Sequence, residues 1–164
     1  MGKNLIQFDK KPSNEIHVVP VDPTNYPFAS AQLFGYWDTA LLIGRPLGDD
    51  TNAARFIGEC EDIIPIQPYG PVFDIGGGGF SPNNPRNVAV FKRYGLRDIV
   101  LKTGDDCNPY NPVYMYDNAP TVTTSPGSQS IGYISPDQPS VKSAAAGQTV
   151  RVIYHAKYPA LPVN

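Results

Sequence analysis

The chain has 164 residues, a formal net charge of −2 and 41% hydrophobic residues, which is sufficient for a globular domain with its own core. Its 18 prolines and 15 glycines argue against a helical bundle. The nearly neutral charge argues against a broad basic face for nucleic acid, and no apolar run approaches the roughly 20 residues that span a bilayer.

The first 30 residues differ in composition from the rest of the chain. They combine four prolines with lysines and isolated apolar residues, and they cannot close a core by themselves. The spacing of the apolar residues favours an extended arm that docks on another surface, and a disordered tail is the alternative. We therefore expect an extended N-terminal arm over 1–30 and a single β-rich domain over 31–164. The N-terminus lacks the apolar stretch of a signal peptide, which predicts synthesis in a cytoplasm.

Short strands are the main predicted elements of the domain. The clearest signal lies at 148–157, where Val150, Val152 and Tyr154 alternate with polar residues. Segments rich in β-branched and aromatic residues predict further strands at 16–21, 55–60, 87–94, 96–102, 112–116 and 130–134. Gly, Pro and Asn turns between them predict a mainly β fold, a small antiparallel β-barrel or sandwich. Only two short helices are expected, near 29–34 and 141–146.

Residues 65–87 form a predicted irregular surface loop. They contain spaced prolines, four consecutive glycines and a Ser-Pro-Asn-Asn-Pro stretch, and a loop of this length is typical of a binding role. The glycines do not form a phosphate-binding loop, because Phe80 and Ser81 follow where a lysine and a helix start are required.

A short Ile-Gly motif, which we call the Ile-Gly echo, occurs in two of the predicted strands. The first contains Ile57-Gly58 and the second contains Ile131-Gly132. Glycine at both places fits a bulge or a close crossing of strands in each half of a barrel. Two shared residues are not by themselves evidence of a duplication.

The sequence offers little evidence for a catalytic or metal site. Cys60 and Cys107 favour two separate thiols over a disulfide, and with His17 and His155 they lack the spacing of zinc ligands. The stretch 103–111 is rich in Asp and Asn but lacks the pattern of a calcium loop, which favours Asx turns. No Gly-x-Ser-x-Gly nucleophile motif occurs. We expect no enzyme, cofactor or metal site; a hydrolase that uses His17 or His155 is the alternative.

Aromatic side chains are the remaining candidates for a binding surface. Tyr110, Tyr114 and Tyr116 alternate along one predicted strand, and tyrosine offers a large contact area with a polar group at low entropic cost. A second cluster contains Tyr36 and Trp37. A carbohydrate- or receptor-binding β-module that uses Tyr36, Trp37, Tyr114 and Tyr116 is therefore one possible function.

Four stretches, at 99–105, 112–116, 131–134 and 144–152, together resemble the small β-rich head decoration, or cement, proteins of tailed bacteriophages. In that family a strand leads through Gly-Asp to a Val-Tyr strand, and a later Ile-Gly strand precedes an Ala-Ala-Gly turn and a closing strand. The resemblance implies a structural virion protein, made in the host cytoplasm, that binds the outer capsid surface. It further implies a homotrimer that bridges subunits of the major capsid protein, without direct contact to nucleic acid or membrane.

The arm and the tyrosines would supply the contacts of such a protein. Lysines in the arm would favour an acidic capsid surface, and its apolar residues could add a strand to a neighbouring sheet edge. The candidate capsid or subunit contacts are Leu5, Ile6, Phe8, Lys10, Lys11, Ile16, Val18, Tyr110, Tyr114 and Tyr116.

Overall fold

A computed structural model describes residues 16–28, 33–66, 86–117 and 120–159. These residues form ten strands and one short 3-10 helix, which confirms the mainly β prediction. The elements are β1 (Ile16–Val21), β2 (Phe34–Asp38), β3 (Ile43–Pro46), η1 (Asp50–Arg55), β4 (Phe56–Ile66), β5 (Arg86–Lys92), β6 (Tyr94–Leu101), β7 (Pro112–Asp117), β8 (Thr121–Thr123), β9 (Gly132–Ile134) and β10 (Thr149–His155).

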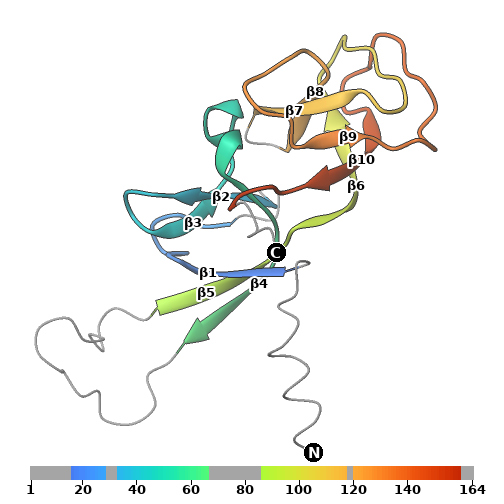
Figure 1. Cartoon of the computed structure of the whole chain (residues 1–164). Helices are drawn as coiled ribbons and strands as arrows, with labels where there is room; N and C mark the ends of the chain where they lie inside the picture. Colours follow the sequence, from blue (N-terminus) through green and yellow to red (C-terminus); the bar gives the residue numbers. More distant parts are fainter. Residues whose placement is uncertain (1–15, 29–32, 67–85, 118–119, 160–164) are drawn as a thin grey trace, which may run out of the picture.

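The strands close into two five-stranded barrels that follow one another along the chain (Figure 1). The strand order is β1-β3-β2-β4-β5 in the first barrel and β6-β8-β7-β9-β10 in the second, and the last strand of each pairs with its first. Only Arg93 separates β5 from β6, so the chain passes directly from one barrel into the other. The barrel prediction is therefore correct, but the fold contains two barrels.

The two barrels have the same topology. In each, the first and third strands are parallel neighbours, through Val21 and Gly44 in the first barrel and through Leu101 and Val122 in the second. All other neighbouring strands in both barrels are antiparallel. The described residues thus contain one folding pattern twice.

The Ile-Gly echo lies at equivalent positions of the two barrels, on the fourth strand of each or directly before it. A Cβ on Gly58 would lie 2.1 Å from the carbonyl oxygen of Lys92, and a Cβ on Gly132 would lie 2.1 Å from that of Ile153. Lys92 and Ile153 both belong to the fifth strand of their barrel. Glycine therefore permits the same close crossing of strands in both barrels, as the sequence indicated.

The predicted arm over 1–30 is in part a strand of the first barrel. Residues 16–21 form β1, which pairs along its whole length with β5. Residues 1–15, with the candidate contacts Leu5, Ile6, Phe8, Lys10 and Lys11, lie outside the described residues. Residues 67–85 of the predicted loop also lie outside them.

The helix predictions were less successful. The segment near 29–34 lies mostly outside the described residues, and Phe34 already belongs to β2. The helix at 141–146 does not form, because Val141 exchanges both backbone hydrogen bonds with Cys107 and the Asp106 carboxylate accepts the N–H of Ser143 at 2.7 Å. The helix that does form, η1, begins after Asp49, whose carboxylate accepts the N–H of Thr51 at 2.8 Å.

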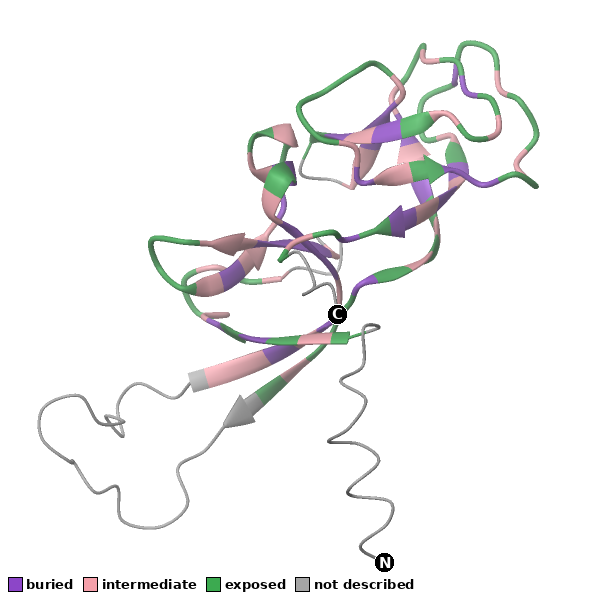
Figure 2. Cartoon of the chain, viewed as in Figure 1, coloured by how far each residue is buried: buried purple, intermediate pink, exposed green. Residues whose placement is uncertain are grey.

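The main hydrophobic core joins the two barrels (Figure 2). The ring of Phe34 in the first barrel packs edge-on against Tyr154 in the second, at 5.2 Å between centroids, and against Phe56 at 5.3 Å. A smaller core around Phe91 fills the first barrel. Because aromatic side chains of both barrels share one core, the two barrels pack as one body.

Candidate functional site

The second barrel carries a row of tyrosines on its outer surface. Tyr114 and Tyr116 alternate along β7 with buried residues, so both point away from the core. Tyr133 on β9 is the ladder partner of Pro112 on β7 and therefore lies on the same face of the sheet. Tyr133 and Tyr116 are both exposed, and Tyr114 is partly so.

Tyr110 extends this row just before β7. Its side chain is 68% exposed and stacks on the ring of Tyr133, with 6.1 Å between centroids and 22° between planes. Its backbone φ of 68° lies in the left-handed region, which is rare for a bulky residue. The backbone N–H of Tyr110 donates to the carbonyl of Ile134 at 2.9 Å. The turn thus holds a large exposed ring in place in an unfavourable backbone conformation, as binding residues often are held.

A cation lies at the other end of the row. The Lys102 ammonium is 4.6 Å from the ring centroid of Tyr116. We call Tyr110, Tyr114, Tyr116 and Tyr133 the tyrosine face. The predicted alternation holds for Tyr114 and Tyr116 on β7, but Tyr110 lies in the turn before this strand and not on the strand face that the sequence predicted. Tyr133 comes from another strand, and no sequence signal links it to the other three.

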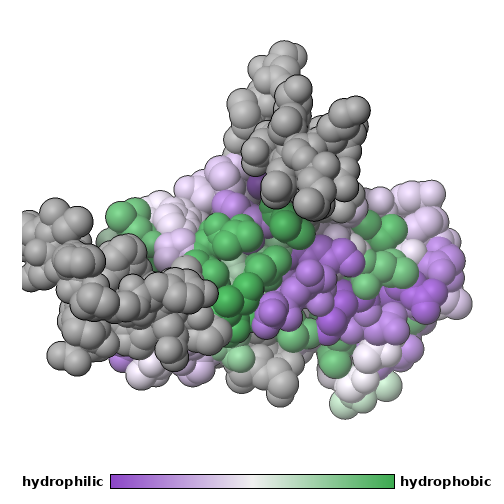
Figure 3. Space-filling model, turned by 90° about the horizontal axis from the view of Figure 1, so that it is seen from below, coloured by the Kyte–Doolittle hydropathy of each residue, from purple (hydrophilic) through white to green (hydrophobic). Residues whose placement is uncertain are grey.

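The first barrel carries an apolar outer face. Val18 on β1 is the ladder partner of Val90 on β5, and Val88 on β5 lies between Pro20 on β1 and Ile64 on β4. Cross-strand partners project to the same side of a sheet, so these side chains form one surface. Figure 3 shows hydrophobic residues gathered on the side of the molecule where Figure 1 places β1, β5 and β4. We call this the apolar face, made of Ile16, Val18, Pro20, Ile64, Val88 and Val90.

Side chains of the apolar face remain open to solvent, although they belong to a folded sheet. Val18 is 53% exposed, Ile16 45% and Ile64 44%. Contiguous exposed apolar surface on a folded protein marks an interaction site more often than a scattered residue does. Ile16 and Val18 are two of the contact residues expected from the sequence.

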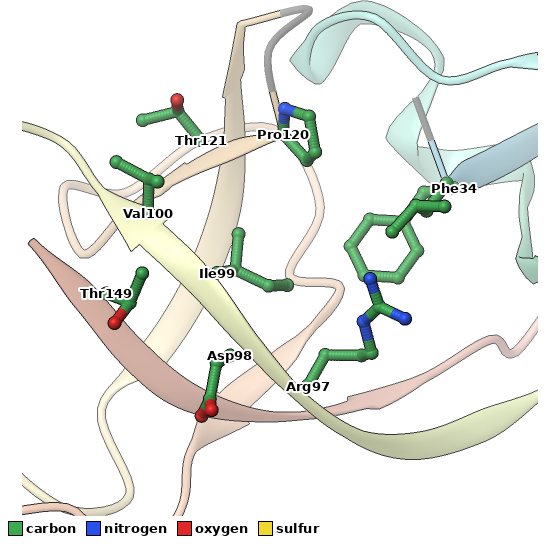
Figure 4. Close-up of a pocket in the computed structure, with 9 residues that line it drawn as sticks. Phe34, Arg97, Asp98, Ile99, Val100, Pro120, Thr121 and Thr149 are labelled. Carbon is green, nitrogen blue, oxygen red and sulfur yellow. The ribbon is translucent and has the colours of Figure 1, made fainter. Parts of the chain in front are cut away.

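A hollow of about 390 Å³ lies where the barrels meet (Figure 4). Leu33 and Phe34 line it from the first barrel, and residues 97–100, Pro120, Thr121 and Thr149 line it from the second. Arg97 donates to Glu59 at 2.8 Å, and Asp98 lies 3.5 Å from Arg151. Both charged side chains of the hollow are therefore already paired within the protein.

The two histidines of the enzymatic alternative belong to different barrels. His17 is on β1 of the first barrel and His155 ends β10 of the second. Burial, with the nearby charge of Arg93, lowers the pKa of His17, and the His155 ring packs edge-on against Tyr94. Cys60 and Cys107 are free thiols. Within the described part of the chain, no group of three or more His, Cys, Asp or Glu side chains is placed to hold a metal ion.

The acidic loop after β6 serves the fold. The Asp105 carboxylate accepts the Thr123 hydroxyl and, at 3.1 Å, the N–H of Thr124. The Asn111 side chain accepts the N–H of Asn108, three residues before it, at 2.7 Å. This bond runs in the opposite direction to the expected Asx turn, in which the acceptor side chain precedes the donor.

The structure also separates the residues of the carbohydrate alternative. Tyr36 and Trp37 lie on β2 of the first barrel, whereas Tyr114 and Tyr116 lie on β7 of the second. Tyr36 is buried in the shared core, and Trp37 packs against the core of the first barrel. The four residues therefore do not form one platform.

Comparisons with known proteins add no relative. No protein-family model, no curated protein and no solved structure matches the chain. In the described ranges, no helix is long and apolar enough to cross a membrane.

Proposed function

We propose that this protein is a capsid decoration protein, a structural binding protein that attaches to the outer surface of an assembled phage capsid and bridges subunits of the major capsid protein. The observation that supports this most is the tyrosine face. Four tyrosines share one outer surface, and the most exposed of them, Tyr110, sits in a strained backbone conformation. Tyrosine is enriched at the centres of protein interfaces, where its ring excludes water and its hydroxyl finds a partner.

The stretches that resemble decoration proteins coincide with the barrel that carries this face. Residues 112–116 belong to β7, 131–134 include β9, and 144–152 lead into β10. All four stretches, from Ile99 to Val152, fall within the second barrel, which runs from Tyr94 to His155. The first barrel then adds a separate surface to the same unit.

Stabilisation of a capsid by such a protein follows from mass action. A ligand that binds only the assembled state, at a free concentration of 100 times its Kd, stabilises that state by about 2.7 kcal/mol per site. A protein that binds two neighbouring subunits at once also holds them together, which neither contact does alone. The proposed location is the outer surface of the virion, after synthesis in the host cytoplasm.

Density-gradient fractionation of a lysate that contains the protein, with mass spectrometry of each fraction, tests the proposal. We expect the chain to follow DNA-filled particles in constant proportion. The double variant Tyr110→Ser/Tyr114→Ser should lose at least nine-tenths of this association. The matched control is Tyr94→Ser, which removes an exposed tyrosine outside the tyrosine face and should leave association unchanged.

Two results would contradict the proposal. Wild-type protein that stays among free soluble proteins would exclude capsid attachment, and a double variant that still follows the particles would exclude the tyrosine face. In the first case, a glycan array would test the carbohydrate alternative, for which the stacked rings of Tyr110 and Tyr133 provide an aromatic platform.

A further inference from the structure

We infer that the apolar face of the first barrel is the surface on which a second copy of this chain docks, so that the protein forms a face-to-face dimer. This inference does not depend on the proposed function, because it concerns the isolated protein. It rests on a comparison that the two barrels make possible.

The equivalence of the barrels identifies which residues correspond on their outer faces. Lys92 and Ile153 correspond, since each lies under the crossing glycine of its barrel. Two residues earlier, the fifth strands carry Val90 and Arg151. The register then pairs Val90 with Val18 in the first barrel, as it pairs Arg151 with Asp98 in the second. The same two positions thus hold two valines in one barrel and an acid with a base in the other.

The acid–base pair of the second barrel shows what this fold requires at these positions. Arg151 lies 3.5 Å from Asp98 and 2.8 Å from Asp137, and all three side chains are largely solvated. The barrel therefore closes without an apolar pair there. Val18 and Val90 bring no necessary packing to their own barrel, and Val18 is left 53% exposed. An apolar pair that the fold does not need is best explained by burial against another surface.

The charges around the apolar face indicate a second copy as the occupant. Lys92, the ladder partner of Ile16, lies at one end, and Glu61 and Asp62 lie on the β4 side, with Asp62 opposite Val90. All three charged side chains are exposed. In a face-to-face pair, a two-fold axis that runs diagonally across the face, through Val90, places Lys92 of one copy over Asp62 of the other, which makes the surface complementary to itself in that orientation. The net charge of −2 gives two copies little mutual repulsion.

The size of the face sets the expected strength. Three adjacent strands with five residues each cover about 15 by 15 Å at the usual strand spacing and rise. This area of about 225 Å² per copy is well below the roughly 800 Å² per partner of a standard interface, so we expect a weak, reversible dimer with a Kd of about 100 μM or above. One face that packs on its own copy closes as a pair. A three-fold assembly would instead require this face to contact a different surface of its neighbour.

Sedimentation equilibrium of the full chain, at total concentrations from about 10 μM to about 1 mM, tests the inference. Wild-type protein should change from monomer to dimer over this range. The variant Val18→Asp/Val90→Arg, which introduces the pair found in the second barrel, should keep the wild-type circular dichroism and raise the Kd at least tenfold. Leu96→Ser is the matched control, because Leu96 is also 53% exposed but lies on the second barrel.

A second variant keeps the inference testable if the double substitution impairs folding. Lys92→Glu leaves every apolar residue in place and should also weaken the dimer, and adding Asp62→Lys should restore it. A wild-type protein that is monomeric throughout, or trimeric, would overturn the inference. So would a folded Val18→Asp/Val90→Arg variant that dimerises as strongly as the wild type, or a Lys92→Glu variant with an unchanged Kd.

Discussion

Replacing Gly132 by alanine should destabilise the protein far more than an ordinary Gly→Ala substitution. The new Cβ would lie 2.1 Å from the carbonyl oxygen of Ile153 and 2.7 Å from the Cα of Tyr154. Carbon and oxygen atoms of neighbouring strands normally stay about 3.3 Å apart or more. β9 would therefore have to move away from β10 by about 1 Å at the point where the strands are paired.

The cost can be estimated from what this movement breaks. β9 pairs with β10 through three residues only, so a shift of this size disrupts about two ladder hydrogen bonds, at about 1 kcal/mol each. Overpacking of a tight contact adds about 1–3 kcal/mol. The total of about 3–5 kcal/mol is a large part of the stability of a domain of this size. Gly58→Ala should cost at least as much, because Gly58 also has a φ of +122°.

Urea denaturation followed by circular dichroism measures this cost, and two other glycines provide the control. Gly104 and Gly147 have φ values of +88° and +78°, but a Cβ on either would meet nothing within 4 Å. Their alanine variants should lose only about 1–2 kcal/mol of unfolding free energy, which is the cost of placing a Cβ on a residue with a positive φ. If Gly132→Ala unfolds at the same urea concentration as Gly104→Ala, the close crossing of β9 and β10 is not a constraint, and the close approach no longer explains why Gly132 corresponds to Gly58.

Two further predictions concern titratable groups. Burial lowers the pKa of His17 below its usual 6.5, so the unfolded chain binds a proton more readily than the folded one, and stability should fall as the pH drops below about 6.5 toward the lowered value. Thermal unfolding between pH 7.5 and 5 should show a smaller loss in His17→Gln; an identical loss would exclude His17 as its source. Burial, with the charges of Asp62 and Glu59, raises the pKa of the Cys60 thiol to about 11. Iodoacetamide at pH 8 should therefore modify Cys60 about a hundredfold more slowly than an unstructured cysteine, and an equal rate in peptide mapping would contradict this.

The strands that the sequence predicted are those whose pattern is set locally. Alternation of apolar and polar residues at 148–157 identified β10, and β-branched residues identified β5 and β6. β3 gave no such signal, because it is only four residues long and contains Gly44 and a proline. Its formation depends on a distant contact: a Cβ on Gly44 would lie 2.9 Å from a methyl group of Val19 on β1. Propensity cannot indicate a strand that tertiary packing selects.

The repeated topology could not be predicted for a related reason. Many different side chains are compatible with the same strand order and register, so two barrels with the same strand pairing need not have the same residues. Identity is required only where a side chain does not fit, and this is where Ile57-Gly58 and Ile131-Gly132 correspond. At the outer positions the two barrels have opposite chemistry, with Val18 in one and Asp98 in the other.

The candidate surfaces were predictable only in part. Alternation along one strand placed Tyr114 and Tyr116 on a common side, but Tyr133 joins them through the pairing of β7 with β9. Val90 likewise joins Val18 only through the pairing of β1 with β5. A surface made by several strands becomes visible once the register is known, whereas a surface on one strand can be read from its period.

The apolar face and the tyrosine face have a joint consequence. The apolar face belongs to the first barrel and the tyrosine face to the second, and the shared core fixes the two barrels relative to each other. The contact of Phe34 with Tyr154 belongs to this core. A pair joined through its apolar faces therefore presents two tyrosine faces at a fixed separation. Two weak attachments that are linked rigidly bind a repeating surface far more tightly than either does alone, provided that the spacing matches. A capsid is such a repeating surface, so loss of the apolar face should weaken attachment even though no tyrosine is changed.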